Sequence, residues 1–257
     1  MIINHNMNAI NAHRNMTNNT NASGKSMEKL SSGLRINRAG DDAAGLSISE
    51  KMRGQIRGLD QASRNSQDGI SYIQTAEGAL TEVSAMLTRM KELAVQAKNG
   101  TNNAEDTKNI ELEMDTLTQE ISNINTNTKF NGKNVFTSTV EITVTQDAAG
   151  LLTIGKAALG DTLALTSKST VANIEGAIDE INLQRATYGS QQNRLEHTIN
   201  NLNTTSENLT AAESRIRDVD MAKEMMNFSK NNILQQAAQA MISQANQQPQ
   251  GVLQLLR

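Results

Sequence analysis

Three residues near the start of the chain look at first like part of a phosphate-binding loop. The sequence GKS at 24–26 has the ending of the motif GxxxxGKS, in which backbone amides and a lysine hold phosphate groups. The first glycine of that motif would fall at position 19, which is Asn19, and no strand pattern precedes it. We therefore expect no nucleotide site.

The remaining candidates for catalysis or metal binding are one acidic pair and three histidines. Asp41 and Asp42 are adjacent, but near a helix start such residues are more readily explained as caps for backbone amides. The histidines fall in different helical settings and lack the HExxH spacing of zinc enzymes: His5, His13 and His197. With no catalytic constellation, we expect a non-enzymatic protein without cofactor or metal.

Composition narrows the class of protein. The 257 residues include 24 basic and 27 acidic side chains, a net charge of −3, whereas nucleic-acid binders carry a basic surface. There is no cysteine, so neither a disulfide nor a thiolate metal site can form. Two tyrosines, three phenylalanines and no tryptophan are too few for a conventional core. The abundant Leu, Ile, Met and Ala instead suit contacts between helices.

The sequence also bears on export. No apolar run approaches the roughly 20 residues of a membrane span, and asparagines interrupt the apolar residues of the N-terminus, so we expect no cleaved signal peptide. A chain with no cysteine and one proline can be kept unfolded and then fold without slow disulfide steps. This suits export in an unfolded state, although a cytosolic protein could have the same composition.

Long helices occupy most of the chain. A helix is predicted from Ser47, as N-cap of a capping box with Glu50, to Asn99-Gly100, because apolar residues recur every seven positions. About 50 residues at 1.5 Å each give a length of roughly 75 Å. The recurring positions are Met52, Leu59, Ser66, Ile73, Leu80, Leu87 and Ala94.

The strongest repeat lies in the C-terminal half. Seven apolar residues follow one another at seven-residue intervals, which is typical of coiled coils: Ile174, Ile181, Tyr188, Leu195, Leu202, Leu209 and Ile216. A shorter helix is predicted from about Asn103 to Asn125. The two long helices can be antiparallel neighbours if the segment between them folds back, and the product is then an elongated rod.

The centre of the chain has a different pattern. Asn131-Gly132, between apolar residues, predicts a β-hairpin turn, and residues 139–145 (TVEITVT) alternate as a half-buried strand does. Residues 146–168 are rich in Gly, Ala, Thr and Leu and predict short strands and turns. The expected fold is mainly α, a rod of long antiparallel coiled-coil-like helices with a small β-rich central segment.

The two ends are helical but weak. Residues 5–33 space apolar side chains loosely among Asn, Ser and Thr, which would leave a marginal helix in water: Met7, Ile10, Met16, Met27 and Leu30. Glycines at 33, 40 and 45 predict a connector after this helix. The last helix is rich in glutamine and should end at Pro249. Such segments become ordered when many copies pack together, or else are frayed tails.

Long stretches of the sequence resemble bacterial flagellin, the subunit of the flagellar filament. The N-terminal residues that carry the resemblance are IINHNMNAINAHRN and KLSSGLRINRAGDDAAGLSISEKMRGQIRGL. Further along are RMKELAVQAKNGT and KFNGKNV. The C-terminal match is SRIRDVDMAKEMMNFSKNNILQQAAQAMISQANQQPQGVLQLLR. Only about 137–169 lacks a family pattern.

The resemblance implies three segments. A terminal helix pair, 1–43 with 220–257, is expected to line the core of a hollow filament that serves motility. Residues 44–136 and 170–219 are expected to form an outer helical bundle, and 137–169 a short variable β-rich segment. The C-terminal residues expected to mediate polymerisation, or to be held by a chaperone, are Phe228, Ile233, Leu234, Met241, Ile242, Val252, Leu253, Leu255 and Leu256.

The resemblance also implies partners and a location. The subunit is expected to leave the cell unfolded through the flagellar type III apparatus, held beforehand by an export chaperone near Leu234 to Leu256. It should then assemble with copies of itself, between hook-associated proteins and a filament cap, in the extracellular flagellum. Neither nucleic acid nor membrane is an expected partner.

Recognition by Toll-like receptor 5 is a further implication. Flagellins that this receptor detects present an arginine, a leucine and a glutamate, which match Arg89, Leu93 and Glu113 here, while Thr88 and Met90 differ from strongly recognised versions. The alternative is that Arg89 is a solvated charge and Leu93 a packing residue.

Two alternatives to a filament subunit were weighed. One is a hook-associated or junction protein of similar architecture, and the other is a secreted coiled-coil effector that binds a host protein. An enzyme would need a catalytic insert, and residues 137–169 contain no His or Cys.

Overall fold

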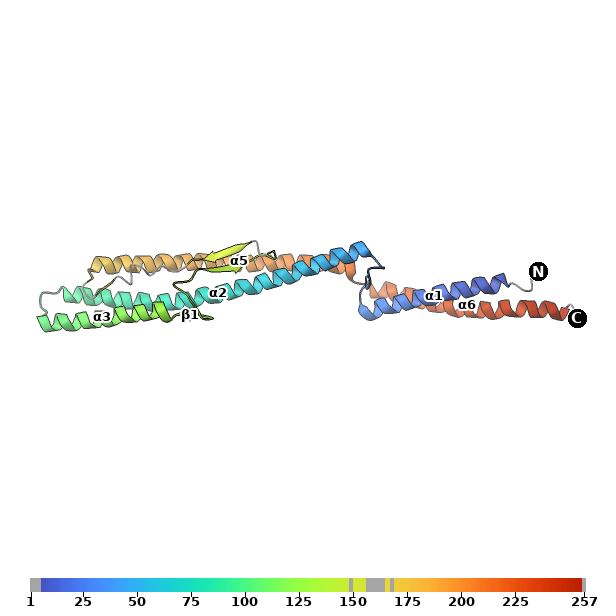
Figure 1. Ribbon diagram of the computed structural model, residues 1–257, viewed down its shortest axis with the longest axis horizontal. Coiled ribbons are helices and arrows are strands. Elements are labelled where there is room, and N and C mark those ends of the chain that lie inside the picture. Colours follow the sequence, from blue (N-terminus) through green and yellow to red (C-terminus); the bar gives the residue numbers. More distant parts are fainter. Residues whose placement is uncertain (1–5, 148–149, 156–164, 167–168, 256–257) are drawn as a thin grey trace. The chain divides into compact units, whose positions relative to one another are not determined.

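The computed structural model describes residues 6–147, 150–155, 165–166 and 169–255, with side chains described up to residue 247 (Figure 1). The chain is mainly helical with two small antiparallel β-ladders, as the sequence predicts. The helices are α1 (Met7–Ser32), α2 (Ala43–Ala97), α3 (Ala104–Asn127), α5 (Val171–Arg217) and α6 (Met221–Leu255). The strands are β1 (Lys129–Phe130), β2 (Lys133–Asn134), β3 (Val140–Thr143) and β4 (Leu151–Ile154).

The chain forms two compact units. Unit 1 comprises Met1–Gly54 and Asn208–Arg257, and unit 2 comprises Gln55–Glu207. The division falls inside α2 and α5, so each of these helices contributes residues to both units. The three segments implied by the family resemblance have other boundaries and stay a prediction.

Unit 2 is built on an antiparallel pairing of α2 and α5. Ser206 donates a hydrogen bond to Asp60 at 3.1 Å, and Lys91 lies 2.9 Å from Glu175 at the other end of the unit. The later residue of α2 contacts the earlier residue of α5, so the two helices run in opposite directions (Figure 1). The predicted repeats form a dry core, which includes Leu59, Ile73, Leu80, Leu87, Ile174, Ile181, Tyr188 and Leu195.

Helix α3 completes the bundle of unit 2 and leads into the predicted hairpin. Ile110, Met114 and Ile121 are buried along α3. Beyond it, β1 pairs with β2 across a two-residue turn in which Asn131 has φ 49° and Gly132 has φ 80°. Positive φ at both turn positions is the type I′ geometry that Asn-Gly favours, so the hairpin prediction is confirmed.

The second ladder covers α2. Strand β3 pairs antiparallel with β4, and the predicted alternation of 139–145 is confirmed by a buried Ile142 between a largely exposed Glu141 and a half-buried Thr143. Ile142 packs so closely on α2 that a Cβ added at Gly69 would overlap its Cδ1 and lie 3.3 Å from Leu195 Cδ1. Glycine at position 69 therefore allows the strand to approach the helix.

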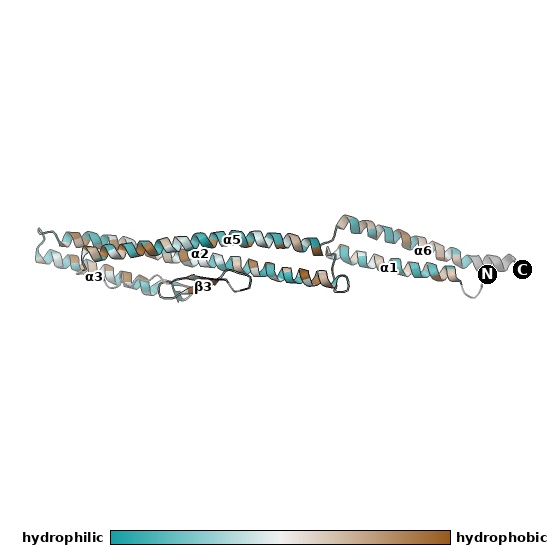
Figure 2. Ribbon diagram, turned by 90° about the horizontal axis from the view of Figure 1, so that it is seen from above, coloured by the Kyte–Doolittle hydropathy of each residue, from teal (hydrophilic) through white to brown (hydrophobic). Residues whose placement is uncertain are grey.

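Unit 1 is a pair of antiparallel helices, α1 and α6, which lie side by side in both views (Figures 1 and 2). Asn6 Nδ2 donates to the carbonyl of Ala245 at 2.7 Å, and Ser23 Oγ donates to Asn232 Oδ1 at 3.1 Å. Helix α1 ends at Gly33, which has φ 72° and donates its N–H to the carbonyl of Lys29.

Two predicted helix boundaries are wrong. Helix α2 begins at Ala43 rather than after Ser47, because Asp42 Oδ1 accepts the N–H of Gly45 at 2.8 Å and caps the helix one turn earlier. Helix α6 does not end at Pro249 but continues to Leu255. A proline inside a helix removes one hydrogen bond, and the glutamines around it can still continue the helical backbone.

No helix in the described part of the chain is long and apolar enough to cross a membrane.

Helix α2 ends at Ala97, two residues before the predicted stop at Asn99-Gly100.

Replacement of two glycines of α2 by alanine should change the free energy of unfolding in opposite directions. Gly78→Ala should raise the free energy of unfolding by about 0.5–1 kcal/mol, because a Cβ there meets nothing within 4 Å and alanine favours helix. Gly69→Ala should lower it by about 1–2 kcal/mol, because Ile142 must move. Urea unfolding followed by circular dichroism measures both, and a gain in stability from Gly69→Ala would contradict the packing described.

Candidate functional site

The outer surface of α1 and α6 carries large apolar side chains. Of the predicted N-terminal residues, Met7, Ile10 and Met27 are more than half exposed, while Met16 and Leu30 are half-buried. In α6 the exposed predicted residues are Ile233 (65%), Leu234 (41%) and Met241 (62%), while Phe228 and Ile242 are half-buried. Leu256 lies outside the described residues, as do the side chains of Val252, Leu253 and Leu255.

Three further exposed residues were missed by the sequence reasoning. Met221, Met225 and Met226 are 48%, 50% and 67% exposed at the start of α6. The spacing of apolar residues predicts a helix that includes Met221 and Met225, but it does not show that the methionines face solvent. The signal was available, because two adjacent methionines point about 100° apart and cannot both face one partner helix.

The contact between α1 and α6 is itself polar. In the described part of α1 the buried residues are Ser23 and Ser26, and on α6 the buried hydrophobic residue is Ala245. Serine and alanine bury little apolar area, so hydrophobic stabilisation between the two helices is small. Many of the larger apolar side chains of both helices, such as Met7 and Ile233, are instead exposed. Unit 1 thus exposes apolar surface that a helix pair stable on its own would bury.

The exposed apolar residues surround both helices. Met7 and Met27 are twenty positions apart, which places them about 200° apart around α1. The apolar residues of α6 are likewise spread around its axis, and Figure 2 shows them scattered among polar residues along both helices. A single partner helix could cover one side only. Complete burial of this surface requires several neighbours.

A groove between α1 and α6 offers amide side chains to such a neighbour. It has a volume of about 450 Å³ and is lined by Asn8, Asn11, Ala12, Asn15, Ala238, Met241, Gln244 and Ala245. Asparagine and glutamine amides both donate and accept hydrogen bonds, and they carry no charge to desolvate. The groove can therefore hold a polar or small apolar side chain from another helix.

Backbone hydrogen bonds join the segment that follows α1 to the segment that precedes α6. Arg35 N–H donates to the carbonyl of Arg217 at 2.7 Å, and Val219 N–H donates to the carbonyl of Gly33 at 3.1 Å. These bonds flank an antiparallel bridge between Leu34 and Asp218. The connectors that follow α1 and precede α6 are thus fixed to each other.

A buried side-chain network supports this junction. Ser49 is fully buried, and its hydroxyl donates to Glu213 at 3.0 Å and accepts from Arg217 Nη1 at 3.2 Å. Arg217 also donates to Glu50, and Arg53 Nε lies 4.0 Å from Glu213. Glu50, which was expected to close a capping box with Ser47, therefore holds α2 to α5 through Arg217 instead.

The acidic pair at 41–42 serves the connector, as the capping interpretation predicts. Asp41 Oδ2 accepts the backbone N–H groups of Arg38 at 3.0 Å and Asn37 at 3.2 Å. These hydrogen bonds, that of Arg38 first, lower the pKa of the Asp41 carboxyl below its usual 3.8. Among the described residues, no group of three His, Cys, Asp or Glu side chains is placed to hold a metal ion. His5 lies outside those residues.

The structure brings together two of the three predicted receptor-binding residues. Arg89 Nε donates to Glu113 at 3.0 Å and Nη1 to Glu92 at 3.1 Å, and these bonds raise the pKa of the guanidinium. The side chains of Arg89 and Glu113 are 51% and 45% exposed. Leu93 is only 2% exposed, because it points into the core of unit 2. The expectation that Leu93 is presented at the surface is not supported.

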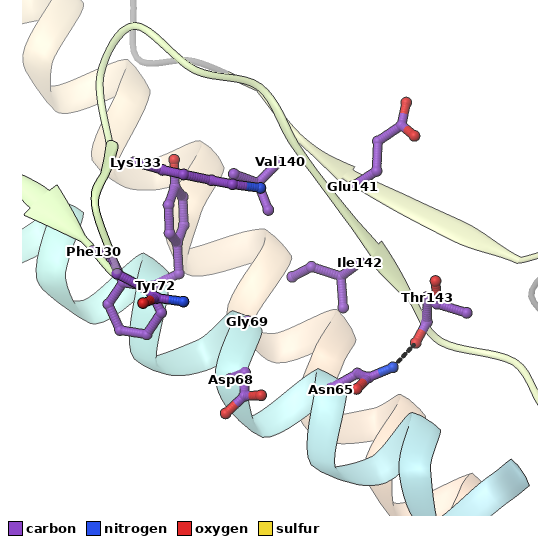
Figure 3. Close-up of a pocket in the computed structure, with 11 residues that line it drawn as sticks. Asn65, Asp68, Gly69, Tyr72, Phe130, Lys133, Val140, Glu141, Ile142 and Thr143 are labelled. Atoms are coloured by element: carbon purple, nitrogen blue, oxygen red, sulfur yellow. Dashed lines mark hydrogen bonds between the residues drawn. The ribbon is translucent and has the colours of Figure 1, made fainter.

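A cavity in unit 2 is lined by both charged and packing side chains. It measures about 280 Å³ and lies between α2, the β1–β2 hairpin and β3 (Figure 3). Burial raises the pKa of Tyr72, whose hydroxyl already donates to the carbonyl of Val135 at 3.1 Å, and its ring packs edge-on against Phe130. Figure 3 shows the carboxylates of Asp68 and Glu141 directed away from each other. The cavity residues thus attach the strands to α2.

Comparison with known proteins gives a consistent result over the whole chain. Residues 3–141 match the bacterial flagellin N-terminal helical region, and residues 171–256 match the bacterial flagellin C-terminal helical region. The chain is 58% identical to a flagellin of Halalkalibacterium halodurans and 52% identical to one of Bacillus subtilis, with 100% of both chains covered in each case. A crystal structure of Bacillus cereus flagellin, 35% identical, covers 58% of this chain and 94% of its own, with a TM-score of 0.49.

The junction network predicts a specific loss of stability. Arg217→Met should lower the free energy of unfolding of unit 1 by about 1–3 kcal/mol, because it removes a hydrogen-bond donor from the buried hydroxyl of Ser49 and the ion-pair partner of Glu50. Arg215→Met, on an exposed position of the same helix, should change it by less than about 0.5 kcal/mol. Urea unfolding followed by circular dichroism compares the two, and equal losses would contradict a role for the network.

Proposed function

The chain belongs to the bacterial flagellin family, and on this premise we propose that α1 and α6 form its polymerising surface. Like the family as a whole, it is a structural subunit of the flagellar filament. The observation that supports the assignment of the surface is the inverted distribution of side chains in unit 1. The buried residues of α1 are serines, while many of the large apolar residues of α1 and α6 are exposed.

Assembly follows from this distribution. Copies of the subunit that pack around α1 and α6 bury the exposed methionines, Ile10, Ile233 and Leu234, which is the main favourable term in protein association. The amides of the groove between the helices pair with polar groups of the neighbours without the cost of burying charge. Each contact is modest, but one subunit makes several at once, so the polymer is far more stable than any single contact.

The same surface supports the proposed export partners. An exposed apolar patch on an unassembled subunit is a site for aggregation, so it needs a cover before polymerisation. An export chaperone that holds the region near Leu234 to Leu256 would supply that cover, and the apolar residues of α6 are its ligands. Release through the flagellar type III apparatus then delivers the subunit to the filament cap and the hook-associated proteins.

Recognition by Toll-like receptor 5 is a second proposal, carried by the exposed Arg89–Glu113 pair. A guanidinium held by two carboxylates has a fixed orientation, and its remaining N–H donors can reach an acceptor on a receptor. Leu93 supports α2 from within the core and is not itself a contact. The junction-protein and effector alternatives lose ground, because the family matches extend over both ends of the chain.

Removal of one exposed apolar side chain should weaken assembly. Ile233→Asp on α6 is expected to raise the critical concentration for polymerisation at least tenfold, since a charge must then be buried between copies, about 1.4 kcal/mol or more. Leu183→Asp is the control, because Leu183 is equally exposed (66% against 65%) but lies in unit 2, and it should change that concentration less than about threefold.

Seeded assembly followed by sedimentation and electron microscopy measures both variants. A protein that lacks 221–257 should form no filaments while unit 2 keeps its helicity. Filaments from that truncated protein, or equal defects in Ile233→Asp and Leu183→Asp, would refute the proposed surface.

Loss of the Arg89 guanidinium should weaken receptor activation. Arg89→Ala is expected to raise the dose for half-maximal activation of reporter cells that express Toll-like receptor 5 by about fivefold or more, as for loss of a charge-assisted hydrogen bond. Arg194→Ala, an exposed arginine of α5, is the control and should leave the dose unchanged. An unchanged dose for Arg89→Ala as well would end this proposal.

A further inference from the structure

The methionines of this chain are divided by location. Among the described residues, those that are close to half exposed or more all lie on α1 and α6: Met7, Met27, Met221, Met225, Met226 and Met241. In unit 2, by contrast, Met90 and Met114 are at most 1% exposed. Since the chain has no cysteine and no tryptophan, these six thioethers are the most readily oxidised accessible groups in the part of the chain that the structure describes.

We propose that the six exposed methionines are a reversible oxidation site, and that their conversion to sulfoxides blocks polymerisation. The co-substrate is hydrogen peroxide or a similar two-electron oxidant. A lone pair on Sδ attacks one peroxide oxygen, and the S–O bond forms as the O–O bond breaks. The departing hydroxide takes the proton of the transferred oxygen and leaves as water. The sulfur is oxidised by two electrons and the peroxide is reduced by two.

The effect on assembly follows from the change in polarity. A thioether is an apolar, flexible group that fits varied packing environments, whereas a sulfoxide carries a strongly accepting oxygen. Burial of that oxygen between subunits without a hydrogen-bond donor is unfavourable. Because the methionines surround both helices, oxidation affects contacts with several neighbours at once. This inference rests on the proposed role of α1 and α6 in polymerisation.

Assembly should change the access of an oxidant to these methionines. In the unassembled subunit the six methionine residues are about half exposed or more. In a filament held by this surface they are covered, and a peroxide molecule cannot reach them. Oxidation therefore acts on subunits and spares finished filaments. Methionine sulfoxide reductases, with a thiol reductant, restore the thioether and hence the capacity to assemble.

The test uses the full chain in three states: untreated monomer, monomer treated with hydrogen peroxide, and preformed filaments treated in the same way. Mass spectrometry of peptides should show oxidation of the six sites at least about tenfold faster than of Met90 and Met114 in the monomer, and protection in the filament. The critical concentration in seeded assembly should rise at least about tenfold after treatment. Repair with reductases for both sulfoxide epimers should reverse the rise.

A substituted protein isolates the sulfurs. Leucine is close to methionine in volume, so the variant should assemble before treatment and should be insensitive to peroxide afterwards. Its substitutions are Met7→Leu, Met27→Leu, Met221→Leu, Met225→Leu, Met226→Leu and Met241→Leu. If this variant folds poorly, repair of the oxidised wild-type protein decides the question without any substitution.

The outcomes distinguish failure of the oxidation proposal from failure of the proposed polymerising surface. If oxidised wild-type monomer assembles like untreated monomer, or if reductase repair fails to restore assembly, the oxidation proposal is wrong while the polymerising surface stands. If filaments of untreated protein oxidise at the six sites as fast as monomers do, α1 and α6 are not buried in the polymer, and the proposed surface itself is wrong.

Discussion

Helices α1 and α6 meet through serine, asparagine and alanine, and this choice of small and polar contacts governs the behaviour of the whole chain. Two helices of this length normally stay together because apolar stripes face each other. Here Ser23 donates to Asn232, Asn6 donates to a backbone carbonyl, and many of the larger apolar side chains are exposed. The pair is specific in register but gains little from burial. Other copies of the chain must supply the missing hydrophobic stabilisation.

Unit 2, unlike unit 1, is stabilised by its own buried apolar residues. Its heptad positions, such as Leu80 and Ile181, are fully buried and make a dry seam between α2 and α5. The absence of a side chain at Gly69 lets Ile142 of the β3–β4 ladder pack closely on α2. Both long helices continue into unit 1, where the buried polar network around Ser49 and Arg217 replaces the apolar seam. One pair of helices thus passes from a self-sufficient core into a junction that depends on specific polar partners.

Much of this architecture could be predicted from periodicity and turn chemistry. Seven-residue repeats dictate which side of α2 and α5 is buried, and Asn131-Gly132 has few alternatives to a type I′ turn. Sites that depend on competition between local signals were harder. Ser47 and Glu50 matched a capping box, but Asp42 supplied a cap one turn earlier, and only the three-dimensional structure shows which oxygen reaches a free amide.

The candidate site was predictable in part for the same reason. That the ends lack apolar contacts follows from their composition, so Met7 and Ile233 could be named in advance. Leu93 could not be placed, because family resemblance identifies a residue without its exposure, and here it turns into the core. The contact between Ser49 and Arg217 joins residues 168 positions apart in the sequence, a distance at which no periodic pattern carries information.

The scarcity of aromatic residues has a practical consequence for spectroscopy. Both tyrosines, Tyr72 and Tyr188, are buried in unit 2, and the chain has no tryptophan. Ultraviolet absorbance and intrinsic fluorescence of tyrosine therefore follow unit 2 alone, whereas the amide signal of helices comes from both units. Both tyrosines lie in the unit that does not depend on neighbours, so the terminal helices can unfold or pack against other copies without a change in the tyrosine signal.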